Sequence, residues 1–161
     1  MWNAITYFQT LATKLKATKT NYCFCRVSGI NNLEDVLANG QRYKAFFAVD
    51  DSDDGVTIQR GGGYFNRRAI VVYILKKYKI TDMTDRENTM NECRSIYKSI
   101  LSKLIKDCSD YSPFELSYLD KTRIPYHEVP GMFAVETTGL YFILTIEEPI
   151  ELVYDATEWE S

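Results

Sequence analysis

Residues 84–108, TDRENTMNECRSIYKSILSKLIKDC, predict the element around which the rest of the chain is arranged. The apolar residues of this stretch recur at steps of three and four, which places them on one stripe of an α-helix. They are Met90, Cys93, Tyr97, Ile100, Leu101, Leu104, Ile105 and Cys108. Thr84 and Glu87 have the spacing of a capping box at the start of this helix. About 24 helical residues extend roughly 36 Å, enough to cover a small sheet.

The composition of the chain predicts one globular domain. Of the 161 residues, 45% are hydrophobic and 25% are charged. We expect a single domain over residues 1–161, because a chain of this size buries roughly 70% of its unfolded surface. No apolar run approaches the roughly 20 residues that cross a bilayer, and no signal peptide opens the chain, so we expect synthesis in a cytoplasm and no membrane contact. The net charge of −3 argues against a general nucleic-acid coat.

The cysteines predict neither a disulfide in the long helix nor a metal site. Cys93 and Cys108 are about 15 positions apart on one helix, roughly 22 Å, which is too far for a bond. Cys23 and Cys25 point to one face of a strand, but the single histidine of the chain leaves a four-ligand zinc site without partners. We predict free thiols and no metal or cofactor, with redox or metal chemistry as the less favoured alternative.

The other elements predict an α+β fold with one mainly antiparallel sheet. Residues 3–18 form an amphipathic helix, and Asn32 caps a short helical turn. Strands are expected at residues 22–28, 44–49, 69–75 and 115–119, and a hairpin is expected from residues 133–136 through a turn at 137–139 to residues 140–147. Residues 124–129 contain Pro125 and are expected to form an edge segment or an extended loop. Residues 69–75 and 140–146 are apolar on both alternating faces, so they belong to the middle of a sheet covered on both sides. The long helix would lie across one face.

An acidic stretch follows the second predicted strand. It contains Asp50, Asp51, Asp53 and Asp54. We predict that it is the solvated loop of a β-hairpin. A calcium loop is the first alternative, but position 12 of the EF-hand pattern is Gly61, where a bidentate glutamate is required. The second alternative is an interaction surface whose negative charge repels phosphates.

A run of glycines interrupts the next predicted strand. Gly61, Gly62 and Gly63 are followed by Arg67 and Arg68 at the start of the apolar run. No helix with a Lys-Ser or Lys-Thr pair follows, as a phosphate-binding loop requires. We therefore predict a flexible loop with basic flanks, which serves as an interface.

Two further surfaces are candidates for contacts between subunits. The polar face of the long helix carries Arg94, Lys98, Lys103 and Lys106. Residues 150–161 include Tyr154 and Trp159 and are too apolar for an idle tail, so we expect them to dock on this subunit or on a neighbour.

Evidence for an enzyme is weak. His127 and Glu128 are neighbours, but the sequence ties no serine or cysteine nucleophile to them. The acidic stretch, Glu115 and Lys121 could serve a metal-dependent nuclease, although their spacing is not diagnostic. We expect no catalytic residues.

In its size and order of elements the sequence resembles the tail-terminator and tail-completion (neck) proteins of tailed bacteriophages. An N-terminal helix leads into YCFCRV at residues 22–27, and a strand pair with an exposed loop precedes the long helix. A closing hairpin then runs from FAVE at residues 133–136 to LYFIL at residues 140–144. The resemblance covers nearly the whole chain and lies in this order of elements.

The resemblance implies a structural virion protein. Such proteins form a ring, commonly of six copies, at the tail or neck junction, where they end tail assembly and join the tail to the head. The partners would be further copies, tail-tube proteins and head-completion or adaptor proteins, with DNA passing through without sequence recognition. The acidic stretch would line the channel, and the basic helix face would meet solvent or the acidic side of the next subunit. A protein-binding or regulatory module and a metal-dependent nuclease are the alternatives.

Overall fold

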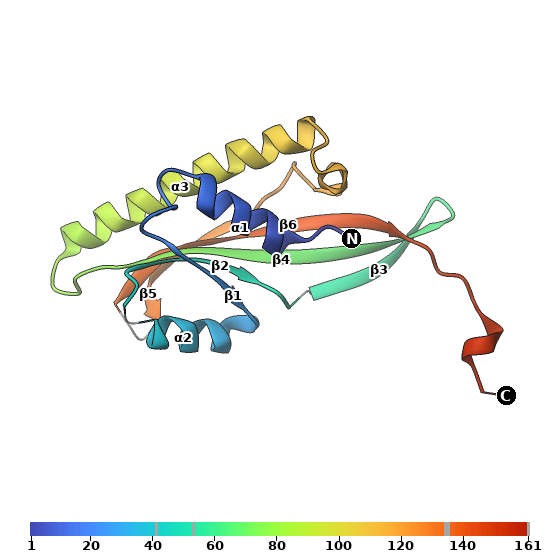
Figure 1. Ribbon diagram of the computed structural model, residues 1–161, viewed down its shortest axis with the longest axis horizontal. Helices are drawn as coiled ribbons and strands as arrows, with labels where there is room; N and C mark the ends of the chain where they lie inside the picture. The colour runs from blue at the N-terminus through green and yellow to red at the C-terminus, as the bar shows by residue number, and fades with distance from the viewer. Residues whose placement is uncertain (41, 53, 134–135, 161) are drawn as a thin grey trace.

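The computed structural model describes residues 1–40, 42–52, 54–133 and 136–160, without the side chains of residues 131–133 (Figure 1). The elements follow in the order α1 (Ala4–Lys14), β1 (Cys23–Val27), α2 (Gly29–Asn39), β2 (Ala45–Asp50), β3 (Asp54–Arg60), β4 (Gly63–Lys77), α3 (Met83–Ser109), η1 (Phe114–Tyr118), β5 (Tyr126–Phe133), β6 (Thr137–Ile150) and η2 (Ala156–Glu158). The N-terminal helix is confirmed, although it ends at Lys14 instead of at residue 18.

The strands form one sheet in the order β1-β2-β4-β6-β5, with β3 paired to part of β4. Among the described strand pairs, β1 and β2 alone are parallel, and α2 connects them, because parallel neighbours need a crossover. The other described pairs are antiparallel. The two runs that are apolar on both faces lie in β4 and β6, at the centre of the sheet. The predicted α+β class with a mainly antiparallel sheet is thus confirmed.

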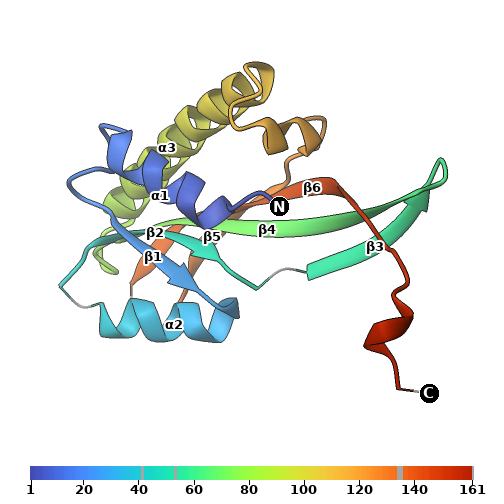
Figure 2. The same ribbon diagram turned by 45° about the vertical axis from the view of Figure 1, so that its right-hand side comes forward.

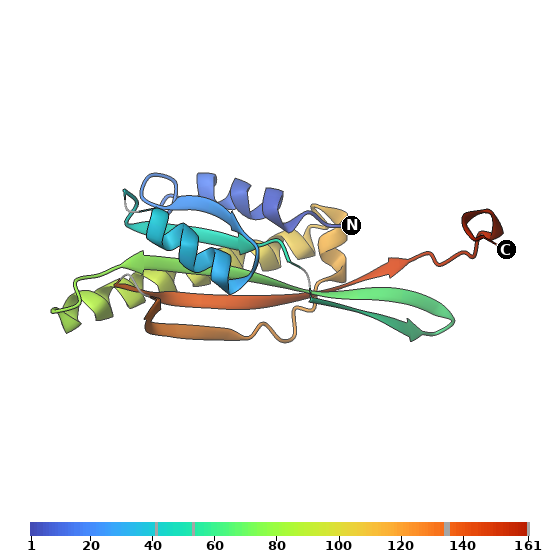
Figure 3. The same cartoon turned by 90° about the horizontal axis from the view of Figure 1, so that it is seen from below.

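Helices cover both faces of the central strands. Figures 1 and 3 show α1 and α3 on one side of the sheet and α2 on the other. Within β2, Phe47 and Val49 belong to the core under α1 and α3, while Phe46 and Ala48 belong to the core under α2. This alternation explains why all of β2 is buried.

The long helix lies across the sheet as predicted, but its cap differs. Asp82 is the N-cap, and its carboxylate accepts hydrogen bonds of 3.0 Å from the backbone N–H groups of Thr84 and Asp85. The predicted capping box is therefore wrong, because the helix begins at Met83, before Thr84. The buried stripe also includes Ile96, whereas Ile105, predicted to be buried, is exposed.

Three local predictions are wrong. Residues 114–118 form the 3-10 helix η1 instead of a strand, and Leu119 alone bridges to Ile146 of β6. The helix α2 begins at Gly29, so Asn32 lies inside it and accepts a hydrogen bond from the Ser28 N–H. Residues 137–139 lie within β6 instead of in a turn. The hairpin itself is present, because β5 pairs with β6, and its residues 134–135 lie outside the described residues.

The acidic stretch is not a hairpin loop. Both strands beside it pair with β4: Val49 of β2 lies opposite Val72, and Asp54 of β3 lies opposite Ala69. The stretch therefore interrupts one continuous edge along β4. The hairpin turn lies instead at Gly61 and Gly62, between Arg60 and its strand partner Gly63.

Candidate functional site

An arm of the sheet extends beyond the helices. It consists of β3, the first part of β4 and the last residues of β6, as Figures 1 and 3 show. Gly61 and Gly62 have φ angles of 54° and 84°, the left-handed conformations that a two-residue hairpin turn requires. Along β3 almost every residue is exposed, including Val56, and β4 is its only strand partner among the described residues. The glycines thus form a tight turn at the tip of this arm instead of the predicted loop.

The C-terminal segment, residues 151–160, leaves the sheet at the end of this arm. Figure 2 shows it running away from the body of the protein to a single turn of η2. Large apolar side chains along it are 59–75% exposed: Leu152, Val153, Tyr154 and Trp159. The rings of Tyr154 and Trp159 stack with centroids 6.2 Å apart. Exposed apolar groups gathered on one segment are typical of an interaction site.

One carboxylate stabilises the turn in this segment. Asp155 caps η2 and accepts hydrogen bonds from the backbone N–H of Thr157 at 2.8 Å and its hydroxyl at 2.7 Å. These bonds lower the pKa of Asp155 below its ordinary value. The turn places Tyr154 and Trp159 side by side, so the segment presents a paired aromatic surface to solvent.

The first two acidic residues after β2 are held by their own chain. Asp50 is buried and accepts hydrogen bonds from the backbone N–H of Gly29 at 3.1 Å and from the Ser52 N–H and hydroxyl at 2.9 and 2.6 Å. Asp51 accepts from Ser28 and Arg26, and these bonds hold its pKa below the ordinary value. These two carboxylates therefore connect the start of α2 to β2.

The acidic stretch continues with Asp53 and Asp54. Asp54 is exposed at the start of β3. Asp53 lies outside the described residues. The prediction that the acidic stretch lines a channel therefore depends on the second half of the stretch, because the side chains of Asp50 and Asp51 turn toward the protein.

The two arginines of the predicted interface lie on different faces of β4. Arg68 is buried and donates to Glu148 at 2.8 Å and to the carbonyl oxygen of Trp2 at 3.2 Å. The backbone N–H of Trp2 donates to the same glutamate at 2.6 Å. Arg67 is exposed and lies opposite Glu147 in the register. Arg68 therefore anchors the N-terminus to the sheet, and Arg67 alone faces solvent.

The predicted basic face of α3 is largely paired within the chain. Arg94 donates to both carboxylate oxygens of Glu128 in β5, at 2.7 and 2.8 Å, which raises the pKa of Arg94 and lowers that of Glu128. Lys103 pairs with Asp107, and Lys106 pairs with Asp110 at 2.7 Å. Lys98 is exposed. These pairs leave no continuous basic stripe.

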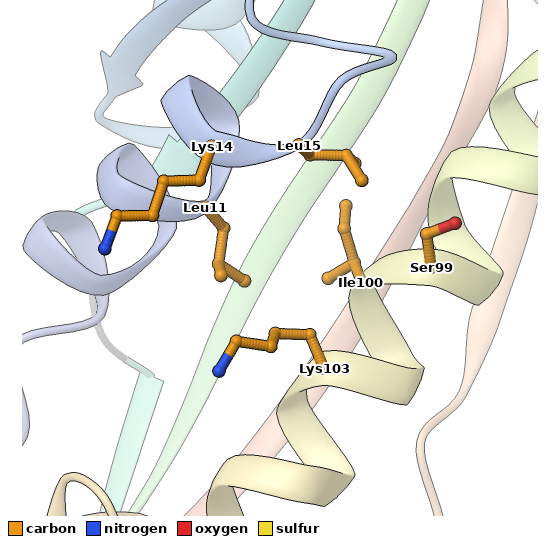
Figure 4. Close-up of a pocket in the computed structure, with 6 residues that line it drawn as sticks. All are labelled: Leu11, Lys14, Leu15, Ser99, Ile100 and Lys103. Atoms are coloured by element: carbon orange, nitrogen blue, oxygen red, sulfur yellow. The ribbon is translucent and has the colours of Figure 1, made fainter.

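A groove lies between α1 and α3. It has a volume of about 210 Å³ and is lined by Leu11, Lys14, Leu15, Ser99, Ile100 and Lys103. In Figure 4, Leu11 of α1 and Leu15, which follows the last residue of α1, point toward Ile100 of α3, and Lys103 extends toward α1. The groove thus has an apolar floor and a basic rim. The sequence did not predict it, because it arises only where two helices far apart in the chain lie side by side.

The described residues form no recognisable reactive site. His127 stacks on Tyr141 with ring centroids 5.0 Å apart, while its neighbour Glu128 pairs with Arg94. No three His, Cys, Asp or Glu side chains in the described ranges gather as a metal site would require. Burial raises the pKa of Cys93 to about 11 and that of Cys25 to about 12, so neither is an activated thiol.

No protein-family model matches the sequence, and no curated protein matches it. Among the described residues, no helix combines the length and the apolar character that crossing a membrane requires. The class that the structure defines is an α+β domain with a projecting arm and an exposed C-terminal segment.

Proposed function

We propose that this protein is a structural subunit that assembles with further copies into a closed ring, as the tail-terminator and neck proteins of tailed bacteriophages do. The observation that carries the proposal is the C-terminal segment with its exposed apolar side chains, Leu152, Val153, Tyr154 and Trp159. Burying them against another chain removes apolar surface from water, which stabilises the contact by roughly 25 cal/mol for each Å² of apolar surface buried.

The shape of the subunit supports a head-to-tail contact. The arm and the C-terminal segment lie at one end of the molecule, while α1, α2 and α3 cover the body (Figure 1). Different surfaces on the two sides of a contact generate a ring when the rotation between copies closes, and a filament when it does not. A subunit that ends an assembly has to form the closed ring.

In a phage particle this ring would sit at the tail or neck junction. One face would bind the last tail-tube subunits, and the other would bind a head-completion or adaptor protein. DNA would pass through the middle without being read, since the chain carries a net charge of −3. Within the acidic stretch, Asp54 is a described residue that is exposed, and it would face such a channel.

A protein-binding module is the second candidate, and the same exposed segment favours it. In that case Tyr154 and Trp159 would engage a different protein, and the chain itself would stay monomeric. Self-association therefore separates the two candidates.

The test is the mass of the full chain in solution, measured by light scattering and native mass spectrometry over a concentration series. We expect a closed oligomer, about six copies by the phage resemblance, and a ring with a central channel in electron micrographs. A chain that remains monomeric at the highest concentration would exclude the ring. An open filament of indefinite length would exclude a role in ending assembly.

A further inference from the structure

We propose that the C-terminal segment of one copy, residues 151–160, docks in the groove between α1 and α3 of a second copy. This inference rests on the proposed function, because it identifies the contact that joins neighbouring subunits in the ring. The occupant is a second copy of this chain, and the anchor is the aromatic pair Tyr154 and Trp159.

The size of the groove favours side chains over a small molecule. Its volume of about 210 Å³ is below the roughly 300–1,000 Å³ of small-molecule sites. The floor formed by Leu11, Leu15 and Ile100 is apolar. Aromatic anchors that fill small apolar pockets dominate the binding energy of many protein interfaces. The groove therefore suits one or two side chains of a docked segment.

The charges of the two surfaces are complementary. The segment carries Glu151, Asp155, Glu158 and Glu160 and contains no lysine or arginine. The rim of the groove carries Lys14 and Lys103. Lys103 already pairs with Asp107, whereas Lys14 makes no ion pair within the described ranges. The acidic segment would thus meet a lysine that has no carboxylate partner among the residues that the structure describes.

The geometry favours a second copy over the segment's own groove. Phe142 of β6 contacts Tyr97 of α3, with ring centroids 5.2 Å apart, and the strand continues to Ile150. At about 3.3 Å per residue, those 8 residues carry the chain about 26 Å past this contact. The segment then continues away from α1 and α3 (Figures 1 and 3). It would have to reverse its direction to reach its own groove.

The first experiment measures self-association of the full chain by sedimentation. Trp159→Ala should weaken it about 30-fold, because aromatic anchors often contribute about 2 kcal/mol, at 1.4 kcal/mol per tenfold. Phe114→Ala is the matched control, since Phe114 is a similarly exposed aromatic outside the segment, and should change the affinity less than threefold. Circular dichroism checks that both variants are folded.

Charge reversal then tests the groove. Lys14→Glu and Glu158→Lys should each weaken association about three- to tenfold, and the double variant should recover most of the loss, because the charges are exchanged. Lys98→Glu, an exposed lysine of α3 that does not line the groove, should have little effect. If Trp159→Ala weakens association but Lys14→Glu does not, the segment docks elsewhere and the groove assignment is wrong.

Mixing two variants tests which copy is bound. A Lys14→Glu/Lys103→Glu chain keeps its segment intact, and a Trp159→Ala chain keeps its groove intact, so the mixture should form dimers and nothing larger. No dimer would indicate that each segment occupies its own groove, which overturns the inference. If the wild-type chain forms rings that Trp159→Ala leaves intact, this inference fails and the proposed function stands. If the wild-type chain is monomeric, both fail.

Discussion

Gly139 should be the glycine that this fold tolerates least well as alanine. It lies in the central strand β6, opposite Leu75 of β4, with a φ of +148° that residues with side chains rarely adopt. A Cβ added there would overlap the carbonyl oxygen of Ile74 and lie 3.0 Å from the Cα of Leu75. These are backbone atoms of the neighbouring strand, so they cannot rotate away.

The cost of Gly139→Ala has two parts. The backbone conformation costs about 1–3 kcal/mol for a residue with a side chain. The overlap adds about 1–3 kcal/mol, as overpacking of a core does, because β4 and β6 have to separate. The sum of about 4 kcal/mol is a large part of the 5–15 kcal/mol that stabilises a typical domain.

Urea unfolding followed by circular dichroism measures this loss. With a slope of about 2 kcal/mol per M, Gly139→Ala should lower the midpoint by about 2 M. Gly61→Ala is the matched control, because Gly61 also has a positive φ of 54° but nothing within 4 Å of an added Cβ. It should cost only about 1–2 kcal/mol. Equal midpoints for the two variants would refute the close approach of β4 and β6 at Gly139.

Two further predictions concern ionisable groups. The Arg94–Glu128 pair should contribute little to the free energy of unfolding in a double-mutant cycle, since both side chains are partly exposed and solvent screens their attraction. Its contribution should be lost as the pH falls through the lowered pKa of Glu128; a coupling unchanged at acid pH would contradict this. For Cys93, burial raises the pKa from 9.0 to about 11, so the free energy of unfolding should fall as pH rises between these values. Cys93→Ala should show a smaller fall over that range, and an identical slope would count against a buried, protonated thiol.

The residue pattern of a segment was enough to predict the two central strands and the long helix. The runs in β4 and β6 are apolar on both alternating faces, and only a strand covered on both sides buries both faces. Their central position in the sheet could therefore be predicted from the sequence. The long helix was equally clear, because its apolar residues recur at helical spacing from Met90 to Cys108. Its cap was misassigned because Asp82 and Thr84 are both good capping residues only two positions apart.

The surroundings of Gly139, Asp50 and Asp51 depend on residues that are distant in the sequence. The sequence predicts a turn at Gly139, but the neighbour of this glycine is the backbone of β4, more than sixty positions earlier in the chain. The sequence predicts that Asp50 and Asp51 are solvated, but Asp50 also accepts a hydrogen bond from Gly29 at the start of α2, and Asp51 accepts one from Arg26 of β1. Local sequence carries no record of such distant partners.

The candidate site has one part that the sequence suggested, the C-terminal segment, and one part that only the tertiary structure created, the groove. The composition of the C-terminal segment, with Tyr154 and Trp159 among acids, predicts a contact with this subunit or a neighbour, and the structure adds that these side chains are exposed in the single chain. The groove was not predicted, because it requires Leu11 of α1 and Leu15 at the end of that helix to face Ile100 of α3. An element's periodicity specifies which of its faces is apolar, but the meeting of two such faces depends on the packing of the whole chain.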